Sequence, residues 1–94
     1  MEIINEFDYY LKDLLIKDEE QNTYKSYLSD VKQFINFFEE QYGEKITTFK
    51  HIELLEYINY MKNKKSYRFT TMNRKIASIS CYDEFLIKTG RKNC

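Results

Sequence analysis

Residues 23–42 read TYKSYLSDVKQFINFFEEQY, a stretch whose apolar side chains recur every three or four positions. This spacing places them on one side of an α-helix and so predicts a long amphipathic helix. Asn22 or Thr23 is expected to cap its start by accepting a bond from a free backbone amide, and Gly43 is expected to end it. The predicted buried face consists of Tyr24, Tyr27, Leu28, Val31, Phe34, Ile35 and Phe38.

The same periodicity predicts three more helices, over roughly residues 2–17, 48–63 and 71–89. Proline is absent from the 94 residues, and Gly90 lies where the last helix is expected to end. The connections are short and no heptad pattern is sustained, which argues against a coiled coil. We therefore predict an all-α fold, a compact four-helix orthogonal bundle that forms a single domain over residues 1–94.

Threonines stand near the expected starts of the last two helices. Thr47 or Thr48 is predicted to cap one, and Thr70 or Thr71 the other. The four apolar faces together provide enough material for one buried core. Besides those of residues 23–42, the predicted buried residues are Ile3, Ile4, Phe7, Tyr10, Leu11, Leu14 and Leu15 in the first helix, His51, Ile52, Leu54, Leu55, Ile58 and Met61 in the third, and Met72, Ile76, Ile79, Tyr82, Phe85 and Leu86 in the fourth.

The charges are unevenly distributed along the chain although the net charge is zero. Residues 1–61 contain six basic and 13 acidic side chains, whereas residues 62–94 contain nine basic and two acidic ones. One end of the molecule can therefore carry a positive field that attracts an anionic partner such as nucleic acid. The alternative is that this lysine-rich surface only aids solubility.

Several classes of function lack the residues that they need. His51 is the sole histidine, and neither Cys81 nor Cys94 has a partner at metal-ligand spacing, so no metal and no cofactor are expected. There is no Gly-x-Ser-x-Gly nucleophile and no phosphate-binding glycine loop, so no catalytic residue is predicted. No apolar run is long enough to span a membrane, and the two cysteines suit a reducing, cytoplasmic compartment.

Two expected helix starts are rich in small polar and basic residues. They are residues 22–26, NTYKS, and residues 66–75, SYRFTTMNRK. Helix N-termini present free amides and a partial positive charge, while hydroxyl and amide side chains bond phosphates and base edges. This combination favours a DNA backbone as the ligand. The alternative is that the Ser and Thr residues serve only as helix caps.

At these two segments the chain resembles the N-terminal core-binding (SAM-like) domain of tyrosine recombinases, the phage integrase family. The first motif is Thr23-Tyr24-Lys25-Ser26-Tyr27-Leu28-Ser29-Asp30-Val31, followed by Phe34 and Phe38. The second is Thr71-Met72-Asn73-Arg74-Lys75-Ile76-Ala77-Ser78-Ile79, followed by Tyr82, Phe85 and Leu86. The segment around Ile52, Leu55 and Ile58 occupies the position of the family's third helix, so the resemblance covers nearly the whole chain.

The resemblance implies a DNA clamp whose second and fourth helices lie at the major groove, with double-stranded DNA and neighbouring recombinase protomers as partners. The family continues into a catalytic domain that cleaves DNA through a phosphotyrosyl intermediate, and this chain stops at Cys94 without it, so we expect a non-catalytic fragment. Asn73 and Arg74 are the candidates for base edges. The full candidate set is Thr23, Lys25, Ser26 and Ser29 on the second helix, Thr71, Asn73, Arg74, Lys75 and Ser78 on the fourth, and Lys64, Lys65 and Arg68 as phosphate contacts before it.

A small helical protein–protein interaction module is the alternative function. Phe37, Tyr57 and Tyr60 lie off the main apolar faces and would then form a partner surface. This alternative gains support if their side chains are exposed and contiguous.

Overall fold

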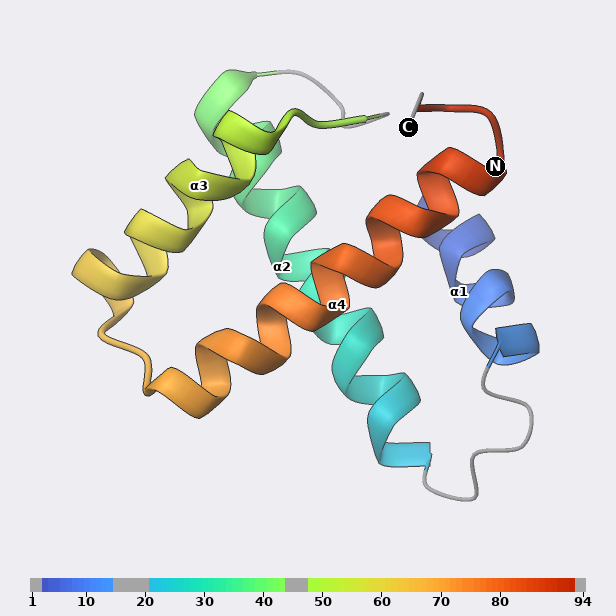
Figure 1. The fold of residues 1–94 in the computed structure, drawn as a ribbon, viewed down its shortest axis with the longest axis horizontal. Helices are drawn as coiled ribbons and strands as arrows, with labels where there is room; N and C mark the ends of the chain where they lie inside the picture. Colours follow the sequence, from blue (N-terminus) through green and yellow to red (C-terminus); the bar gives the residue numbers. More distant parts are fainter. Residues whose placement is uncertain (1–2, 15–20, 44–47, 93–94) are drawn as a thin grey trace.

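The computed structural model describes residues 3–14, 21–43 and 48–92. These ranges contain four α-helices and no strand, which confirms the predicted all-α class. The elements are α1 (Ile3–Leu14), α2 (Gln21–Tyr42), α3 (His51–Tyr60), the short π-helix η1 (Met61–Lys65) and α4 (Phe69–Lys88) (Figure 1).

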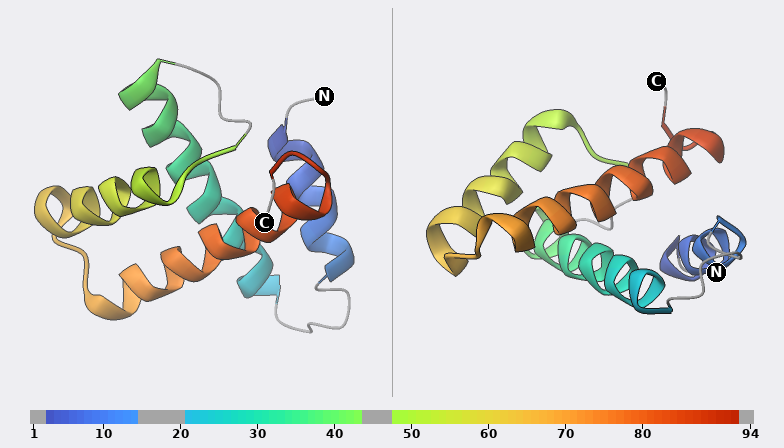
Figure 2. Two further views of the ribbon diagram at one scale, coloured as in Figure 1. Left: turned by 45° about the horizontal axis from the view of Figure 1, so that its top comes forward. Right: turned by 60° about the horizontal axis from the view of Figure 1, so that its bottom comes forward.

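Helices α2 and α4 form the centre of the fold. They cross near their middles, as Figure 1 and the left view of Figure 2 show, and they share the most extensive helix contact. Helix α1 packs against both of them, and α3 contacts the C-terminal half of α2 through the ring of Tyr57, which meets those of Phe34 and Phe37. The N-terminal halves of α2 and α4 diverge from the crossing toward the lower edge of Figure 1. The fold thus brings the two sequence motifs together at one crossing point.

Aromatic rings dominate the core. The Phe34 ring lies 5.0 Å from that of Phe49 and 5.1 Å from that of Tyr57. The Phe7 ring of α1 meets that of Tyr82 at 5.1 Å. Large flat side chains therefore supply much of the buried area that holds the four helices together. The buried apolar residues are Phe7, Leu11, Val31, Phe34, Ile35, Phe38, Phe49, Tyr57, Met61, Ile79, Tyr82, Phe85 and Leu86.

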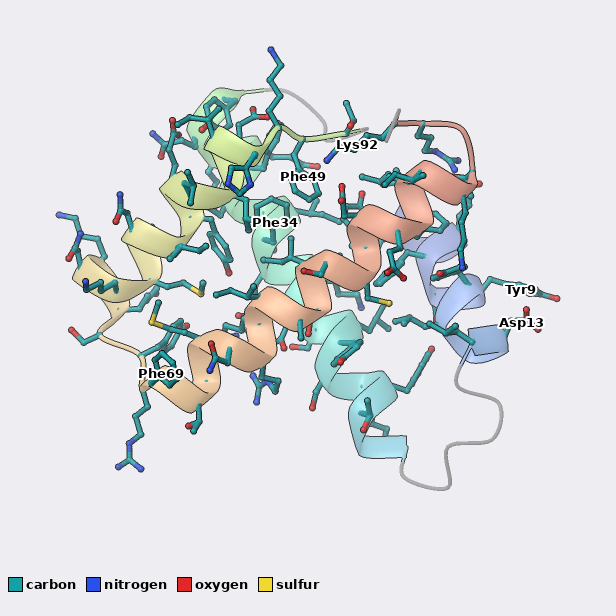
Figure 3. The ribbon with its side chains drawn as sticks, viewed as in Figure 1. Tyr9, Asp13, Phe34, Phe49, Phe69 and Lys92 are labelled. Atoms are coloured by element: carbon teal, nitrogen blue, oxygen red, sulfur yellow. The ribbon has the colours of Figure 1, made fainter. Side chains whose placement is uncertain are left out.

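The predicted buried face of the third helix is right only in part. Met61 is fully buried, and Leu54 and Ile58 pack against the core. Ile52 and Leu55 are 57% and 43% exposed, His51 is exposed as well, and Tyr57 is buried in their place. The cause is Phe49, which lies before the helix and inserts beside Phe34 (Figure 3). This anchor sets the rotation of α3 from outside the helix, so the periodicity of the helix itself does not reveal it. At the end of α1, Leu14 is also exposed rather than buried, and Leu15 lies outside the described residues.

The predicted ends of two helices are confirmed. Gly43 follows α2 with φ +70°, and Gly90 follows α4 with φ +76°. After α4 the Gly90 amide donates to the Ile87 carbonyl at 3.1 Å, and the Arg91 amide donates to the Leu86 carbonyl at 2.9 Å. These two bonds form a Schellman motif, which requires the left-handed conformation that glycine adopts at little cost.

The predicted caps at the helix starts are wrong. Helix α3 begins after Lys50, whose backbone amide donates to the Glu53 carboxylate at 2.6 Å, and α4 begins after Arg68 without a side-chain cap. Helix α2 already begins at Gln21, which places its expected caps inside the helix. The residues concerned are Asn22, Thr23, Thr48, Thr70 and Thr71, while Thr47 lies outside the described residues.

Candidate nucleic-acid interface

A buried carboxylate joins the two motifs where α2 and α4 cross. Asp30 of α2 is 1% exposed and accepts four hydrogen bonds, each 3.0 Å long. Arg74 donates through Nε and Nη2, Lys75 through Nζ and Ser78 through Oγ. Lys75 Nζ also donates to Gln33 Oε1 at 2.6 Å. We call these five residues the Asp30 network.

The electrostatics of the network keep the carboxylate ionised. Burial alone would raise the pKa of Asp30, but the hydrogen bonds from Arg74, Lys75 and Ser78 outweigh it and hold that pKa below its usual value. The Lys75 side chain is only 4% exposed, and its ammonium also faces the ring of Tyr67, with the centroid 5.2 Å away. Since two cations meet one anion, the network retains one positive charge. The buried side chains of Asp30, Lys75 and Ser78 all have hydrogen-bond partners within it.

Three of the predicted DNA-binding residues, Arg74, Lys75 and Ser78, belong to this network. The side chains of Lys75 and Ser78 lie entirely inside it. Both are buried, because they lie on the side of α4 that faces α2. The sequence contained a signal of this burial. Positions 75, 78 and 82 lie on one side of the helix, and Tyr82 belongs to the predicted apolar face. Asp30 was absent from the candidate set, although it stands in the first motif.

Four cationic side chains gather on the turn between α3 and α4. After η1, Ser66 adopts the left-handed conformation with φ +52° and turns the chain toward α4. The four side chains are exposed, and within residues 3–14, 21–43 and 48–92 none of them forms an ion pair. We call this set the basic turn: Lys62, Lys64, Lys65 and Arg68.

The basic residues near the end of the described chain are paired instead. Arg91 Nη2 lies 2.6 Å from a carboxylate oxygen of Glu6 in α1. Lys92 pairs with Asp83, and its Nζ lies 4.5 Å from the ring centroid of Phe49 (Figure 3). The positive charge of residues 62–94 is therefore largely concentrated, in the part of the chain that the structure describes, at the basic turn.

The remaining predicted residues lie on the diverging N-terminal halves of α2 and α4. Lys25 and Ser29 are exposed on α2, whereas Thr23 and Ser26 are half-buried. On α4, Asn73 is exposed and Thr71 is half-buried. The Arg74 side chain is 48% exposed even though two of its nitrogens bond Asp30. Ten of the twelve predicted residues thus keep some exposed surface, all of them except Lys75 and Ser78.

The three residues of the alternative partner surface are contiguous but not exposed together. The Phe37 ring lies 4.7 Å from that of Tyr60 and 5.0 Å from that of Tyr57. Tyr57 is 3% exposed, and the other two are half-buried. With Gln33, Asn36, Glu40, Lys65 and Tyr67 they line a cavity of about 310 Å³. They pack on one another and, through Tyr57, on Phe34, and none of the three is exposed.

Metal-ligand clusters and membrane-spanning helices are both absent from the described residues. Among these residues, no three His, Cys, Asp or Glu side chains lie together in a way that could hold a metal ion. No helix in the same ranges is long and apolar enough to cross a bilayer.

Residues 7–90 match the family described as phage integrase, N-terminal SAM-like domain. The chain belongs to this family. Membership confirms the resemblance that the two motifs indicate, and it assigns the chain to the SAM-like domain and not to the catalytic domain of integrases. The Asp30 network of this SAM-like domain therefore connects the two motifs by which the sequence resembles the family.

The SAM-like domain is also similar to a bacterial resolvase. It is 37% identical over 90 residues to a TnP I resolvase of Bacillus thuringiensis. The alignment covers 96% of this chain and 31% of the resolvase, so the chain spans about a third of that relative's length. No solved structure matches the chain.

Proposed function

We propose that this SAM-like domain binds double-stranded DNA as the non-catalytic clamp of a tyrosine recombinase. The observation that carries the proposal is the basic turn, whose four exposed cations directly precede the polar start of α4. Family membership and the similarity to a resolvase support it. In this proposal a separate catalytic domain cleaves and rejoins the strands, and neighbouring protomers meet on the DNA.

The charge distribution explains how a chain with no net charge would bind a polyanion. Arg74, Lys75, Arg91 and Lys92 are held by carboxylates, whereas the basic turn has none among the described residues. Phosphates would displace only water and counterions there. If each cation of the turn neutralises one phosphate, a log–log plot of association constant against salt has a slope of about −3.6.

The proposed contacts follow from exposure. The basic turn and Lys25 supply sequence-independent affinity, while Asn73 on the exposed side of α4 has the donor and acceptor that an adenine edge requires. Thr23, Ser26, Ser29 and Thr71 are proposed as hydrogen-bond donors to phosphates. Lys75 and Ser78 are left out of the contact set because their polar atoms already bond Asp30, and we propose that they support the interface from within.

A salt titration tests the proposal. We expect the chain to bind a fluorescein-labelled mixed-sequence duplex of about 30 base pairs, measured by anisotropy, with an affinity that falls steeply as salt rises. The variant Lys64→Ala, Lys65→Ala, Arg68→Ala should bind much more weakly at low salt, and its slope should be shallower by about 3.

The control removes the same charge elsewhere. Lys12, Lys50 and Lys88 are exposed and lie outside the basic turn and the N-terminal halves of α2 and α4. Their triple alanine variant should keep most of the wild-type affinity and slope. Wild-type binding that is absent or insensitive to salt would refute the proposal, as would equal losses in the two triple variants.

A further inference from the structure

Arg74 is held in a particular orientation by the Asp30 network. A guanidinium presents one fork of N–H groups along its side, from Nε and Nη2, and a second fork at its end, from Nη1 and Nη2. Asp30 takes the side fork, with Nε–Oδ2 and Nη2–Oδ1 distances of 3.0 Å. Because Asp30 occupies only the side fork, the end fork of Arg74 keeps unused donors. The Arg74 side chain remains 48% exposed.

The carboxylate that holds Arg74 is itself fixed on its other sides. Lys75 Nζ and Ser78 Oγ each lie 3.0 Å from one of its oxygens, and Ser78 Oγ also lies 3.0 Å from the Arg74 carbonyl oxygen, so its single proton is shared between these two acceptors. Gln33 and the ring of Tyr67 in turn fix Lys75. A buried anchor with this many partners leaves the guanidinium little rotational freedom, so binding through it would cost little side-chain entropy.

We infer that Asp30 is a positioning residue of the DNA interface, which presents the end fork of Arg74 to a pair of acceptors on DNA. The inference rests on the proposed function. A phosphate and the O6/N7 edge of guanine both offer such a pair of acceptors. A charge without a fork, such as a lysine ammonium, does not satisfy the same geometry.

Arg74→Lys is the first test, because it keeps the charge and removes the fork. The variant should remain folded, since the side chain is half-exposed and Asp30 keeps its bonds to Lys75 and Ser78. We expect its affinity for the mixed-sequence duplex to fall by about fivefold or more, in the range measured for bidentate contacts. An affinity and salt slope equal to those of wild type would overturn the inference.

A double-mutant cycle tests the role of Asp30 itself. At a temperature where circular dichroism shows Asp30→Asn to be folded, this variant should also bind more weakly than wild type. Asp30→Asn combined with Arg74→Lys should bind no more weakly than Arg74→Lys alone, because Asp30 acts through Arg74. A purely structural role predicts unchanged affinity of the folded single variant, and a screening role predicts tighter binding with a steeper salt slope. Either result would overturn the inference. If Asp30→Asn does not fold, Arg74→Lys decides.

The source of the acceptors is resolved with a second duplex. In a duplex of the same sequence with 7-deazaguanine in place of guanine, N7 is missing and the phosphates are unchanged. If the end fork of Arg74 contacts guanine, the wild type should bind the 7-deazaguanine duplex more weakly than the first duplex. Arg74→Lys should then bind the two duplexes with equal affinity. If the end fork contacts a phosphate, Arg74→Lys should weaken binding by the same factor on both duplexes. Failure of the proposed function is a separate outcome, in which wild type itself shows no salt-dependent binding.

Discussion

The Asp30 network and the basic turn both draw their cations from the basic residues of positions 62–94, but the cations of the network are paired and those of the turn are exposed. In the network, Arg74 and Lys75 converge on one buried carboxylate. In the turn, exposed cations face no carboxylate among the described residues. Residues of the same type, close together in the chain, therefore contribute to stability in one region and to a surface field in the other. Their surroundings, and not their charge, make the difference.

The largest expected effect comes from removing the network's anion. Asp30→Ala leaves the nearly buried Lys75 ammonium without its carboxylate, and breaking such a buried pair costs about 3–5 kcal/mol of unfolding free energy. Urea denaturation followed by circular dichroism measures this loss. Asp13→Ala, which removes an exposed carboxylate from α1, is the matched control and should change the stability by less than about 0.5 kcal/mol. Similar losses in the two variants would show that Lys75 needs no anion.

Acid should weaken the network in a second, smaller way. The pKa of Asp30 is lower in the folded protein than its usual value of about 3.9. Its ionisation therefore stabilises the fold above about pH 4, and this contribution is lost as the pH falls through the folded-state pKa. Each tenfold difference between the acid dissociation constants of the folded and unfolded states contributes about 1.4 kcal/mol to the unfolding free energy.

Thermal melts between pH 6 and pH 2 measure this dependence. The melting temperature of the wild type should fall more steeply below about pH 4 than that of Asp30→Asn, which has no group to protonate at this position. Asp13→Asn should follow the wild-type curve. Parallel curves for wild type and Asp30→Asn would contradict the assignment of an ionised, hydrogen-bonded carboxylate.

The smallest effect on stability is expected in the basic turn. The variant Lys64→Ala, Lys65→Ala, Arg68→Ala removes exposed side chains without ion pairs among the described residues, so its unfolding free energy should lie within about 0.5 kcal/mol per substitution of wild type. The same variant is expected to lose DNA affinity. A decrease of several kcal/mol in the unfolding free energy would instead show that the basic turn, like the Asp30 network, stabilises the fold.

The buried faces and the ends of the helices could be predicted from the sequence to different degrees. The apolar repeat of α2 identified its buried face because neighbouring side chains at three- and four-residue spacing point the same way in any helix. Gly43 and Gly90 marked helix ends because both positions have positive φ. For α3 the repeat identified Leu54, Ile58 and Met61 but wrongly included His51, Ile52 and Leu55. Phe49, which lies outside this short helix and packs on Phe34, contributes to its rotation, and the repeat does not contain it.

The candidate interface divides in the same manner. The excess of positive charge after residue 61 and the polar starts of α2 and α4 were visible in the sequence. Together with the family resemblance they led to ten candidate residues that keep exposed surface. Lys75 and Ser78 were assigned to the same surface through the family resemblance, because both stand in the second motif. Their place on the helix indicated burial, but their partner Asp30 is 45 and 48 positions away in the chain, and no local pattern reveals a contact over that separation.

The sequence by itself determined the helical class, the family, the ends of two helices and the charge asymmetry, because each depends on neighbouring residues or on residue type. The tertiary structure alone decided which cations are free. A lysine or arginine in sequence is a charge without a partner, and only the crossing of α2 and α4 brings Asp30 within 3.0 Å of Arg74 and Lys75. Burying a charge without a partner is strongly destabilising, so a lysine or arginine that the fold encloses needs a carboxylate beside it.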